Sequence, residues 1–278
     1  MSAIVFPDRT MTNLPATTRS TLAQFEPVVL QEIKSISLTD RQDTKFTFHI
    51  HQLDAVLTLL LPFSRILEVD SCRISNYRNH YFDTSDFNFY LQHHNTTRSR
   101  YKVRMRTYPF TDLTFLEVKE KNNRNRTLKS RLLLDEVSLK ISPEWYDFIS
   151  QNSSVDPGSL SRSLDIDFSR ITLTDTQLKE RLTLDFNFRF DFPKQGLHLN
   201  TLVIAEVKQP RYSPSSVFQQ SMRLEKANEM RISKYCLGML LSYPRIKYNR
   251  FKPKMRELYR ITQNPVYRKA VYPNGYLQ

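Results

Sequence analysis

Glycine and cysteine are scarce in this chain. Its 278 residues include 4 glycines and 2 cysteines. Neither GxxxxGKS/T nor GxGxxG occurs, which excludes a glycine-rich loop as the means of binding phosphate. Cys72 and Cys236 form no CxxC pair, and two thiols cannot complete a four-ligand zinc site.

Long apolar runs are missing as well. The longest, residues 55–63, is interrupted by Pro62 and falls short of the roughly 20 residues that span a bilayer. The first residues show no basic segment followed by an apolar one, so no signal peptide is predicted. These features predict a cytoplasmic protein.

Positive charge is abundant. The chain carries 41 Lys and Arg against 28 Asp and Glu, a net charge of +13. This balance favours an anionic partner, whether nucleic acid, polyphosphate, nucleotide or a membrane surface. A charged fraction of 25% and a hydrophobic fraction of 40% are ordinary for a globular protein, so global disorder is excluded.

Alternation of apolar and polar residues predicts a chain dominated by strands. Strands are expected over residues 42–50, 65–69, 73–82, 100–108, 113–121, 127–137, 181–190 and 201–208. Helices are expected over 54–61, 142–149, 161–169, 216–224 and 233–241, with a helical turn within 25–33. The predicted organisation is a poorly ordered extension over 1–24, one domain over 25–248 and a basic tail over 249–278 with at most a short helix. The predicted fold class is α+β, with peripheral helices around an antiparallel sheet.

Charged side chains share one face of each expected strand, because successive residues of a strand point to opposite faces. Lys102, Arg104 and Arg106 lie opposite Val103 and Met105. Five further strands repeat this separation, with the following residues on the charged face: Arg41, Asp43, Lys45; Glu117, Lys119, Lys121; Lys129, Arg131; Arg181, Asp185, Arg189; Glu206, Lys208.

Two arrangements account for this pattern. In one, the charged face of an antiparallel sheet meets water. In the other, the strands close into a barrel, with apolar faces outward under the helices and charges lining a tunnel. So many like charges in a tunnel repel one another unless a polyanion and a divalent cation bind there. The pattern alone leaves both arrangements open.

Other residues are weaker candidates for function. His49 and His51, and likewise His93 and His94, lack a third His or Cys at ligand spacing, so structural roles are expected. Tyrosines interleaved with Arg and Lys over 77–108 are also typical of proteins that bind RNA or single strands. The basic residues of 250–254 suit a solvated face, or contact with acidic lipids.

Eight short segments together carry a family resemblance. They are DTKF (43–46), YFDT (81–84), RYKVRMR (100–106), FLEVK (115–119), LKSR (128–131), RLTLD (181–185), EVK (206–208) and SKY (233–235). In this order they resemble the VTC (vacuolar transporter chaperone) catalytic domain, a polyphosphate polymerase domain of the triphosphate tunnel metalloenzyme (CYTH-like) superfamily, in its bacterial stand-alone form. The resemblance covers about residues 25–254. It implies an antiparallel eight-stranded β-barrel tunnel that binds a triphosphate and a divalent metal, Mn²⁺ or Mg²⁺.

The resemblance also implies an activity and a set of site residues. The terminal phosphate of ATP would be added to a growing chain of inorganic polyphosphate, and the expected partners are ATP, polyphosphate and a membrane protein, with no nucleic acid. The phosphate-binding residues would be Lys45, Arg104, Arg106, Lys119, Lys129, Arg170, Arg181 and Lys234, with Arg131, Lys208 and Arg231 as weaker members. Glu206 would bind the metal, and Glu117 is a weaker candidate ligand.

One motif departs from the superfamily pattern. The superfamily opens with ExExK, whereas residues 41–45 read RQDTK and contain only one carboxylate, Asp43. Superfamily hydrolases use the paired acids to bind metal, so transfer is favoured over hydrolysis. Two alternatives stay open: a hydrolase of triphosphate or nucleoside triphosphate, and a non-catalytic module that binds polyphosphate or RNA.

Overall fold

The computed structural model describes residues 14–35, 41–124, 126–135, 137–177, 179–193 and 196–271. The predicted extension and tail lie partly outside these ranges, at residues 1–13 and 272–278. Two compact units divide the chain. The first comprises the residues up to Ser75 with Ser169–Asn187 and Asn200–Arg231, and the second comprises Asn76–Phe168, Phe188–Leu199 and the residues from Ile232 onward. Strands β8 (Leu160–Asp175) and β9 (Arg181–Phe190) contribute residues to both units.

The first unit is built on antiparallel strands β2 (Gln42–His49), β11 (Leu202–Gln209) and the first part of β9, with the short β12 (Asn228–Glu229) beside β2. β11 lies between β2 and β9. A second group of pairings joins β1 (Glu26–Val28) in parallel to β3 (Ser64–Leu67), which pairs with the end of β8.

Helices cover the apolar face of this unit. They are α2 (Ala16–Gln24), α4 (Leu53–Leu60) and α7 (Val217–Leu224), whereas α3 (Leu30–Ser35) packs Ile33 against Val28 and Leu67 of β1 and β3. Alternate residues of the strands form one buried core with α2, α4 and α7, including Phe46, Phe48, Leu182, Leu184, Val203, Ala205, Leu57, Leu60, Phe218 and Met222. The charged residues of the same strands therefore lie on the face away from these helices.

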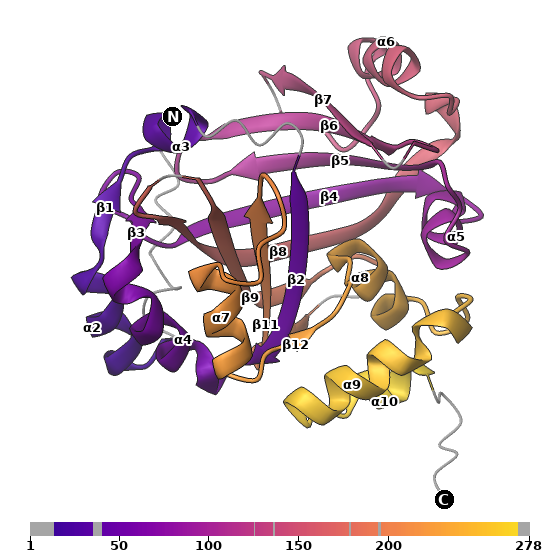
Figure 1. The fold of residues 1–278 in the computed structure, drawn as a ribbon. Helices are drawn as coiled ribbons and strands as arrows, with labels where there is room; N and C mark the ends of the chain where they lie inside the picture. The colour runs from indigo at the N-terminus through magenta and orange to yellow at the C-terminus, as the bar shows by residue number, and fades with distance from the viewer. Residues whose placement is uncertain are drawn as a thin grey trace, which may run out of the picture. The chain divides into compact units, whose positions relative to one another are not determined.

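The second unit contains a four-stranded antiparallel arrangement in chain order, drawn side by side in Figure 1. Its strands are β4 (Ser75–Thr84), β5 (Arg100–Tyr108), β6 (Leu113–Lys121) and β7 (Thr127–Leu134), and β10 (Leu197–Leu199) pairs with the end of β9. The helices are α5 (Asn88–His94), α6 (Pro143–Asn152), α8 (Lys234–Ser242), α9 (Lys252–Thr262) and α10 (Val266–Val271).

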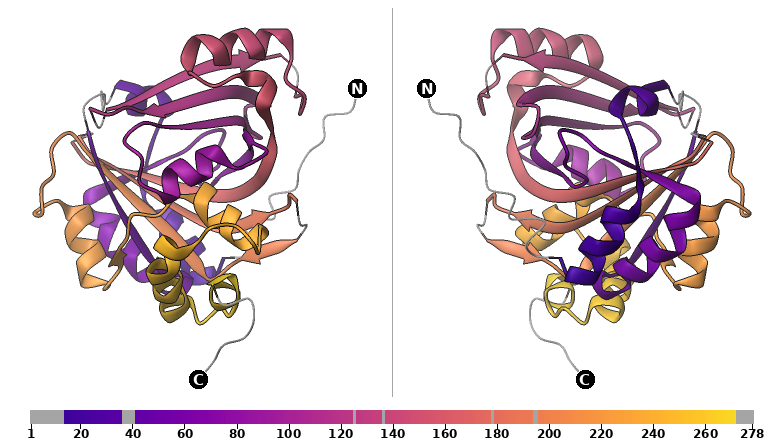
Figure 2. Two further views of the ribbon diagram at one scale, coloured as in Figure 1. Left: turned by 90° about the vertical axis from the view of Figure 1, so that its right-hand side faces the viewer. Right: turned by 90° about the vertical axis from the view of Figure 1, so that its left-hand side faces the viewer.

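The apolar face of β5, β6 and β7 packs against α6, which follows one side of this layer in Figure 2. Val103 and Met105 of β5 and Leu116 of β6 share a core with Trp145 and Ile149 of α6. Ser142 caps this helix, since its Oγ accepts a hydrogen bond from the Trp145 amide at 3.3 Å. In both units, then, the apolar alternate residues lie under helices and the charged ones lie on the other face.

The predicted α+β class, with an antiparallel sheet and peripheral helices, is confirmed. The hydrogen-bonded strand order is β12-β2-β11-β9-β8-β4-β5-β6-β7. Within the described ranges no pairing joins the two ends of this order, so the sheet is open and the closed eight-stranded barrel stays a prediction.

Several expected elements are wrong. Residues 161–169 were expected to be helical but belong to the 16-residue strand β8. Its buried apolar residues occupy even positions up to Phe168 and odd positions from Ile171, which hides the strand period. The segment expected to be a tail with at most a short helix contains the 11-residue α9, which buries Met255 and Leu258, and then α10. Residues 16–24, placed in the poorly ordered extension, form α2.

Among the described helices, none is both long enough and apolar enough to cross a membrane.

Gly238 of α8 gives a test of the packing in the second unit. A Cβ atom there would lie 2.5 Å from Leu164 Cδ2 and 2.7 Å from Phe190 Cδ1. Gly238→Ala is expected to lower the free energy of unfolding by about 1–3 kcal/mol, because the overpacking outweighs the helix propensity of alanine. Urea denaturation measures the change. Gly158→Ala is the control, since its nearest contact would be Asp156 Oδ1 at 3.3 Å; equal losses in both variants would contradict the assignment.

Candidate functional site

The side of β5, β6 and β7 that faces away from α6 carries most of the predicted phosphate-binding residues of the second unit. We call it the cationic face, defined by Lys102, Arg104, Arg106, Glu117, Lys119, Lys129 and Arg131. The strand register orders these residues in rows. Lys102, Lys119 and Lys129 are cross-strand neighbours, and the next row contains Arg104, Glu117 and Arg131.

Glu117 is the centre of this face. Its side chain is only 2% exposed. Oε2 accepts hydrogen bonds from Arg104, at 2.8 Å from Nε, and Oε1 lies 2.5 Å from Lys129 Nζ. Burial by itself would raise the pKa of Glu117, but the neighbouring cations, Arg104 foremost, lower it to about 2. The carboxylate is therefore ionised and holds its two cations in place.

Strand β4 supports the arginines of this face. The Tyr81 hydroxyl accepts a hydrogen bond from Arg104 Nη1 at 3.0 Å. Asn79 accepts one from Arg106 Nε at 2.8 Å and donates one to the Ile166 carbonyl at 3.0 Å. Sequence analysis did not select Tyr81 or Asn79. Asn79 and Tyr81 are alternate residues of the strand expected over 73–82, and this spacing could have placed them together on one face.

The N-terminus of α8 contacts Lys102 of the cationic face and adds one further cation, Lys234. Lys102 Nζ donates to Ser233 Oγ at 3.0 Å, and Ser233 also caps α8 by accepting from the Cys236 amide at 3.3 Å. Lys234 Nζ lies 5.0 Å from the centre of the Phe168 ring. Lys102 was not selected from the sequence, although it shares a face with Arg104.

In the first unit, Glu206 of β11 occupies a comparable position between two lysines. Glu206 Oε1 lies 3.0 Å from Lys45 Nζ, and Oε2 contacts Lys208. Burial lowers the pKa of Lys45, but the attraction of Glu206 outweighs it and the pKa is raised. For the more deeply buried Lys208, burial prevails and lowers the pKa to about 8.

Asp185 of β9 is the third neutralising carboxylate. It is 1% exposed and takes a two-point contact from Arg170 of β8, Nε to Oδ1 at 2.5 Å and Nη2 to Oδ2 at 2.8 Å. Arg181 lies opposite Lys208 in the register of β9 and β11. Arg231, which follows β12, is exposed.

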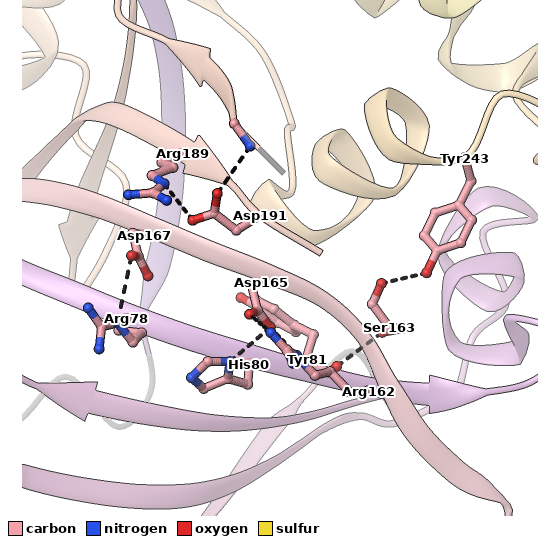
Figure 3. Close-up of polar contacts among 11 residues, drawn as sticks. Arg78, His80, Tyr81, Arg162, Ser163, Asp165, Asp167, Arg189, Asp191 and Tyr243 are labelled. Carbon is pink, nitrogen blue, oxygen red and sulfur yellow. Dashed lines mark hydrogen bonds and ion pairs between the residues drawn. The ribbon is translucent and has the colours of Figure 1, made fainter. Parts of the chain in front are cut away.

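A separate polar cluster lies on the other side of β4 (Figure 3). His80 Nδ1 is 2.8 Å from Asp165 Oδ1, and Arg162 Nε donates to the same oxygen at 2.9 Å. Arg78 is 3.7 Å from Asp167, and Arg189 is 2.5 Å from Asp191. Each carboxylate has a cation beside it, so the cluster forms an ion-paired surface. The mistaken helix over 161–169 concealed it from sequence analysis.

Residues 40–243 match the model of the VTC domain. The chain belongs to the VTC domain family. The domain is similar in structure to a candidate adenylate cyclase from Vibrio parahaemolyticus, at 10% sequence identity over 69% of this chain and 95% of that chain, with a TM-score of 0.41. It is also similar to a candidate adenylyl cyclase from Hippeastrum with a dominant triphosphatase activity, at 14% identity over 71% of this chain and 95% of that chain, with a TM-score of 0.45. A third similar structure is that of protein PH1819 from Pyrococcus horikoshii, at 12% identity over 70% of this chain and 97% of that chain, with a TM-score of 0.38. No curated protein sequence matches the chain.

The two carboxylates predicted as metal ligands, Glu206 and Glu117, differ in how exposed they are. In the described part of the chain, no three or more His, Cys, Asp or Glu side chains gather as a metal site. Mg²⁺ is commonly held by one or two carboxylates together with substrate phosphates. Cations contact both oxygens of Glu206 and of Glu117, but Glu206 is 17% exposed and Glu117 only 2%, so Glu206 is the more accessible to a metal with its phosphates. The histidine pairs make local contacts instead: the His49 ring accepts from the His51 amide at 3.2 Å, and that of His94 from the Arg250 amide at 3.3 Å.

The role of Glu117 is tested by Glu117→Gln. Loss of its charge leaves Arg104 and Lys129 uncompensated, so the free energy of unfolding should fall by about 3 kcal/mol. Denaturant titration measures it. Glu120→Gln, on the opposite side of β6, should change stability by no more than about 0.5 kcal/mol. Equal effects at the two positions would contradict the central role of Glu117.

The cluster of Figure 3 has its own test. Asp165→Asn should destabilise the protein by about 1–3 kcal/mol, because the negative charge beside His80 and Arg162 is lost and one acceptor oxygen becomes an NH2 donor. Burial raises the pKa of Asp165, but hydrogen bonds from His80 and Arg162 reverse the direction, so its pKa is lowered. Its stabilisation is therefore present above the pKa of the unfolded chain and disappears as pH falls through the folded-state pKa. The difference between wild type and variant should shrink in acid.

Asp167→Asn is the matched control for Asp165→Asn. Burial raises the pKa of Asp167, so its ionised form gains nothing from folding. This variant should be neutral or slightly stabilising at pH 7. A larger loss of stability in Asp167→Asn than in Asp165→Asn would contradict the central place of Asp165 in the cluster.

Proposed function

We propose that this VTC domain is a metal-dependent phosphotransferase that binds ATP and polyphosphate and extends inorganic polyphosphate. The observation that carries the proposal is the row of Lys102, Lys119 and Lys129 in register across three adjacent strands. Like charges directly opposite one another destabilise a sheet. A bound polyanion relieves that repulsion, and a chain of phosphates provides closely spaced charges to match it.

The phosphate-binding residues proposed are those implied by the family resemblance. In the second unit they are Arg104, Arg106, Lys119, Lys129 and Lys234, with Arg131 weaker; in the first they are Lys45, Arg170 and Arg181, with Lys208 and Arg231 weaker. Arginine contributes planar two-point contacts to phosphate oxygens, whereas lysine acts as a compact charge. Lys119, Lys129, Arg131 and Arg231 are exposed, so an entering phosphate can reach their side chains.

The protein's own groups position the reactants. Glu117 and Tyr81 fix the guanidinium of Arg104, so its orientation is set before phosphate arrives. Phosphoryl transfer depends mainly on such positioning and on stabilisation of charge. The attacking group is a phosphate oxygen of the acceptor chain, so no side chain has to act as the nucleophile.

Glu206 is the residue proposed to hold Mn²⁺ or Mg²⁺, together with phosphate oxygens. When bound, the metal offsets negative charge that develops on the transferred phosphate and the leaving group. Lys45 and Lys208 contact the same carboxylate.

The proposal is tested by incubating purified protein with ATP and Mn²⁺ or Mg²⁺ and separating the products. Long polyphosphate chains support synthesis, free phosphate alone supports the hydrolase alternative, and no turnover supports the binding module. Glu206→Gln is expected to lower turnover by about a hundredfold or more, since a metal ligand contributes several kcal/mol to the transition state.

Glu229→Gln, a charge change on the exposed strand β12 of the same unit, serves as the control. Normal turnover of Glu206→Gln at saturating metal would remove the metal assignment. An equal loss in both variants would point to a general effect of charge.

A further inference from the structure

The cationic face of the second unit changes character along its strands. Beyond the lysine row and the row of Arg104 and Glu117, the register places Phe115 opposite Arg106 on one side and Leu133 on the other. Leu113 lies opposite Tyr108 in the row that follows. Successive rows on one face are about 7 Å apart, because each residue of a strand advances about 3.4 Å. The face therefore runs from lysine through arginine to aromatic and aliphatic side chains.

This last part of the face, Tyr77, Tyr108, Phe115, Leu113 and Leu133, is called the aromatic end. Tyr108 makes edge contacts with the rings of Tyr77 and Phe115, at centroid distances of 5.2 and 6.0 Å. Two arginines border it: Arg106 lies 5.1 Å from the Tyr77 ring centre, and Arg131 lies 5.2 Å from that of Phe115.

The aromatic end is also incompletely buried. Leu113 is 43% exposed and Leu133 is 50% exposed, while Tyr77, Tyr108 and Phe115 are half-buried. An exposed apolar patch bordered by charge is typical of a binding surface. Its ligand should be flat and apolar on its faces, and it should carry negative charge on the side of the arginines.

We propose that the aromatic end binds the nucleobase of a nucleoside triphosphate, with the triphosphate extending towards Arg104 and the lysine row. This inference rests on the proposed function and adds to it the place of the nucleoside. Aromatic rings and arginine side chains are the groups on which bases stack, and stacking tolerates different bases. The aromatic end begins one row beyond Arg104, so base and phosphates meet chemically matched side chains in sequence.

The subsite has a consequence for specificity. A ligand with the same triphosphate but no nucleoside loses the stacking contact, while its phosphate contacts stay the same. ATP and GTP should therefore bind more tightly than UTP, since purines stack over a larger area, and UTP more tightly than methyl triphosphate.

The experiment measures the affinities of ATP and methyl triphosphate by calorimetry, for wild type, Tyr108→Leu and Phe115→Leu. Wild type should prefer ATP by about tenfold, the range expected for stacking of one base. Each variant should reduce this preference to near one, mainly through weaker binding of ATP. Tyr146→Leu is the control, because Tyr146 is 45% exposed on α6, which packs on the opposite side of the layer.

Failure of the inference can be told from failure of the proposed function. Equal affinities of wild type for ATP and methyl triphosphate would overturn the nucleobase subsite and leave phosphate binding intact, and this comparison needs no variant to fold. Absence of binding by both ligands would overturn both proposals. If Tyr108→Leu lowered the affinities for ATP and methyl triphosphate by the same factor, the Tyr108 ring would belong to the phosphate site and the nucleobase subsite would be overturned.

A second copy of the chain is the competing occupant of this patch. In that case wild type would sediment as a dimer, Phe115→Leu would shift it to monomer, and the ATP preference would be absent. That set of results would also overturn the inference.

Discussion

The cationic face of the second unit and the charged face of the first unit each depend on a carboxylate that neutralises their cations. Cross-strand neighbours lie only about 5 Å apart, so lysines and arginines placed there repel strongly. Glu117 links Arg104 and Lys129 in the second unit, and Glu206 links Lys45 and Lys208 in the first. Without these carboxylates the apolar faces would still bury under their helices, but the charged faces would oppose the pairing of the strands.

Neutralisation divides the cations into two kinds. Arg104 and Arg170 make two-point contacts with carboxylates that are at most 2% exposed, so they are fixed parts of the fold as well as candidate phosphate ligands. Lys129 has a side chain 42% exposed and meets Glu117 through a single nitrogen. A phosphate can attract such a lysine with little disturbance of the strands, because its long stem reorients. The rigid arginines would then set the position of the anion, and the lysines would adapt to it.

The sequence predicted strands well where large apolar residues at alternate positions marked one face. Val103 and Met105 mark it in 100–108, Leu116 and Val118 mark it in 113–121, and both segments were predicted with the correct bounds. β8 was missed because its apolar side changes between Phe168 and Ile171. α9 was missed because Met255 and Leu258, which it buries, are separated by charged residues typical of a tail. For the candidate site, alternation assigned residues to a face, but it could not assign the partners of Glu117, which depend on how three strands are aligned.

That alignment is itself restrained by charge. A shift of β5 against β6 by one residue would turn the charged face of one strand towards the helices, and burial of the apolar residues excludes it. A shift by two residues leaves every side chain on its original face, so burial of the apolar residues does not exclude it. In one direction it would place Arg104 opposite Lys119, and in the other opposite Phe115, in place of Glu117. After either shift, Arg104 could no longer donate hydrogen bonds to both Tyr81 and Glu117. Glu117 therefore neutralises the cations of the cationic face and also favours the register of β5 and β6 that forms this face.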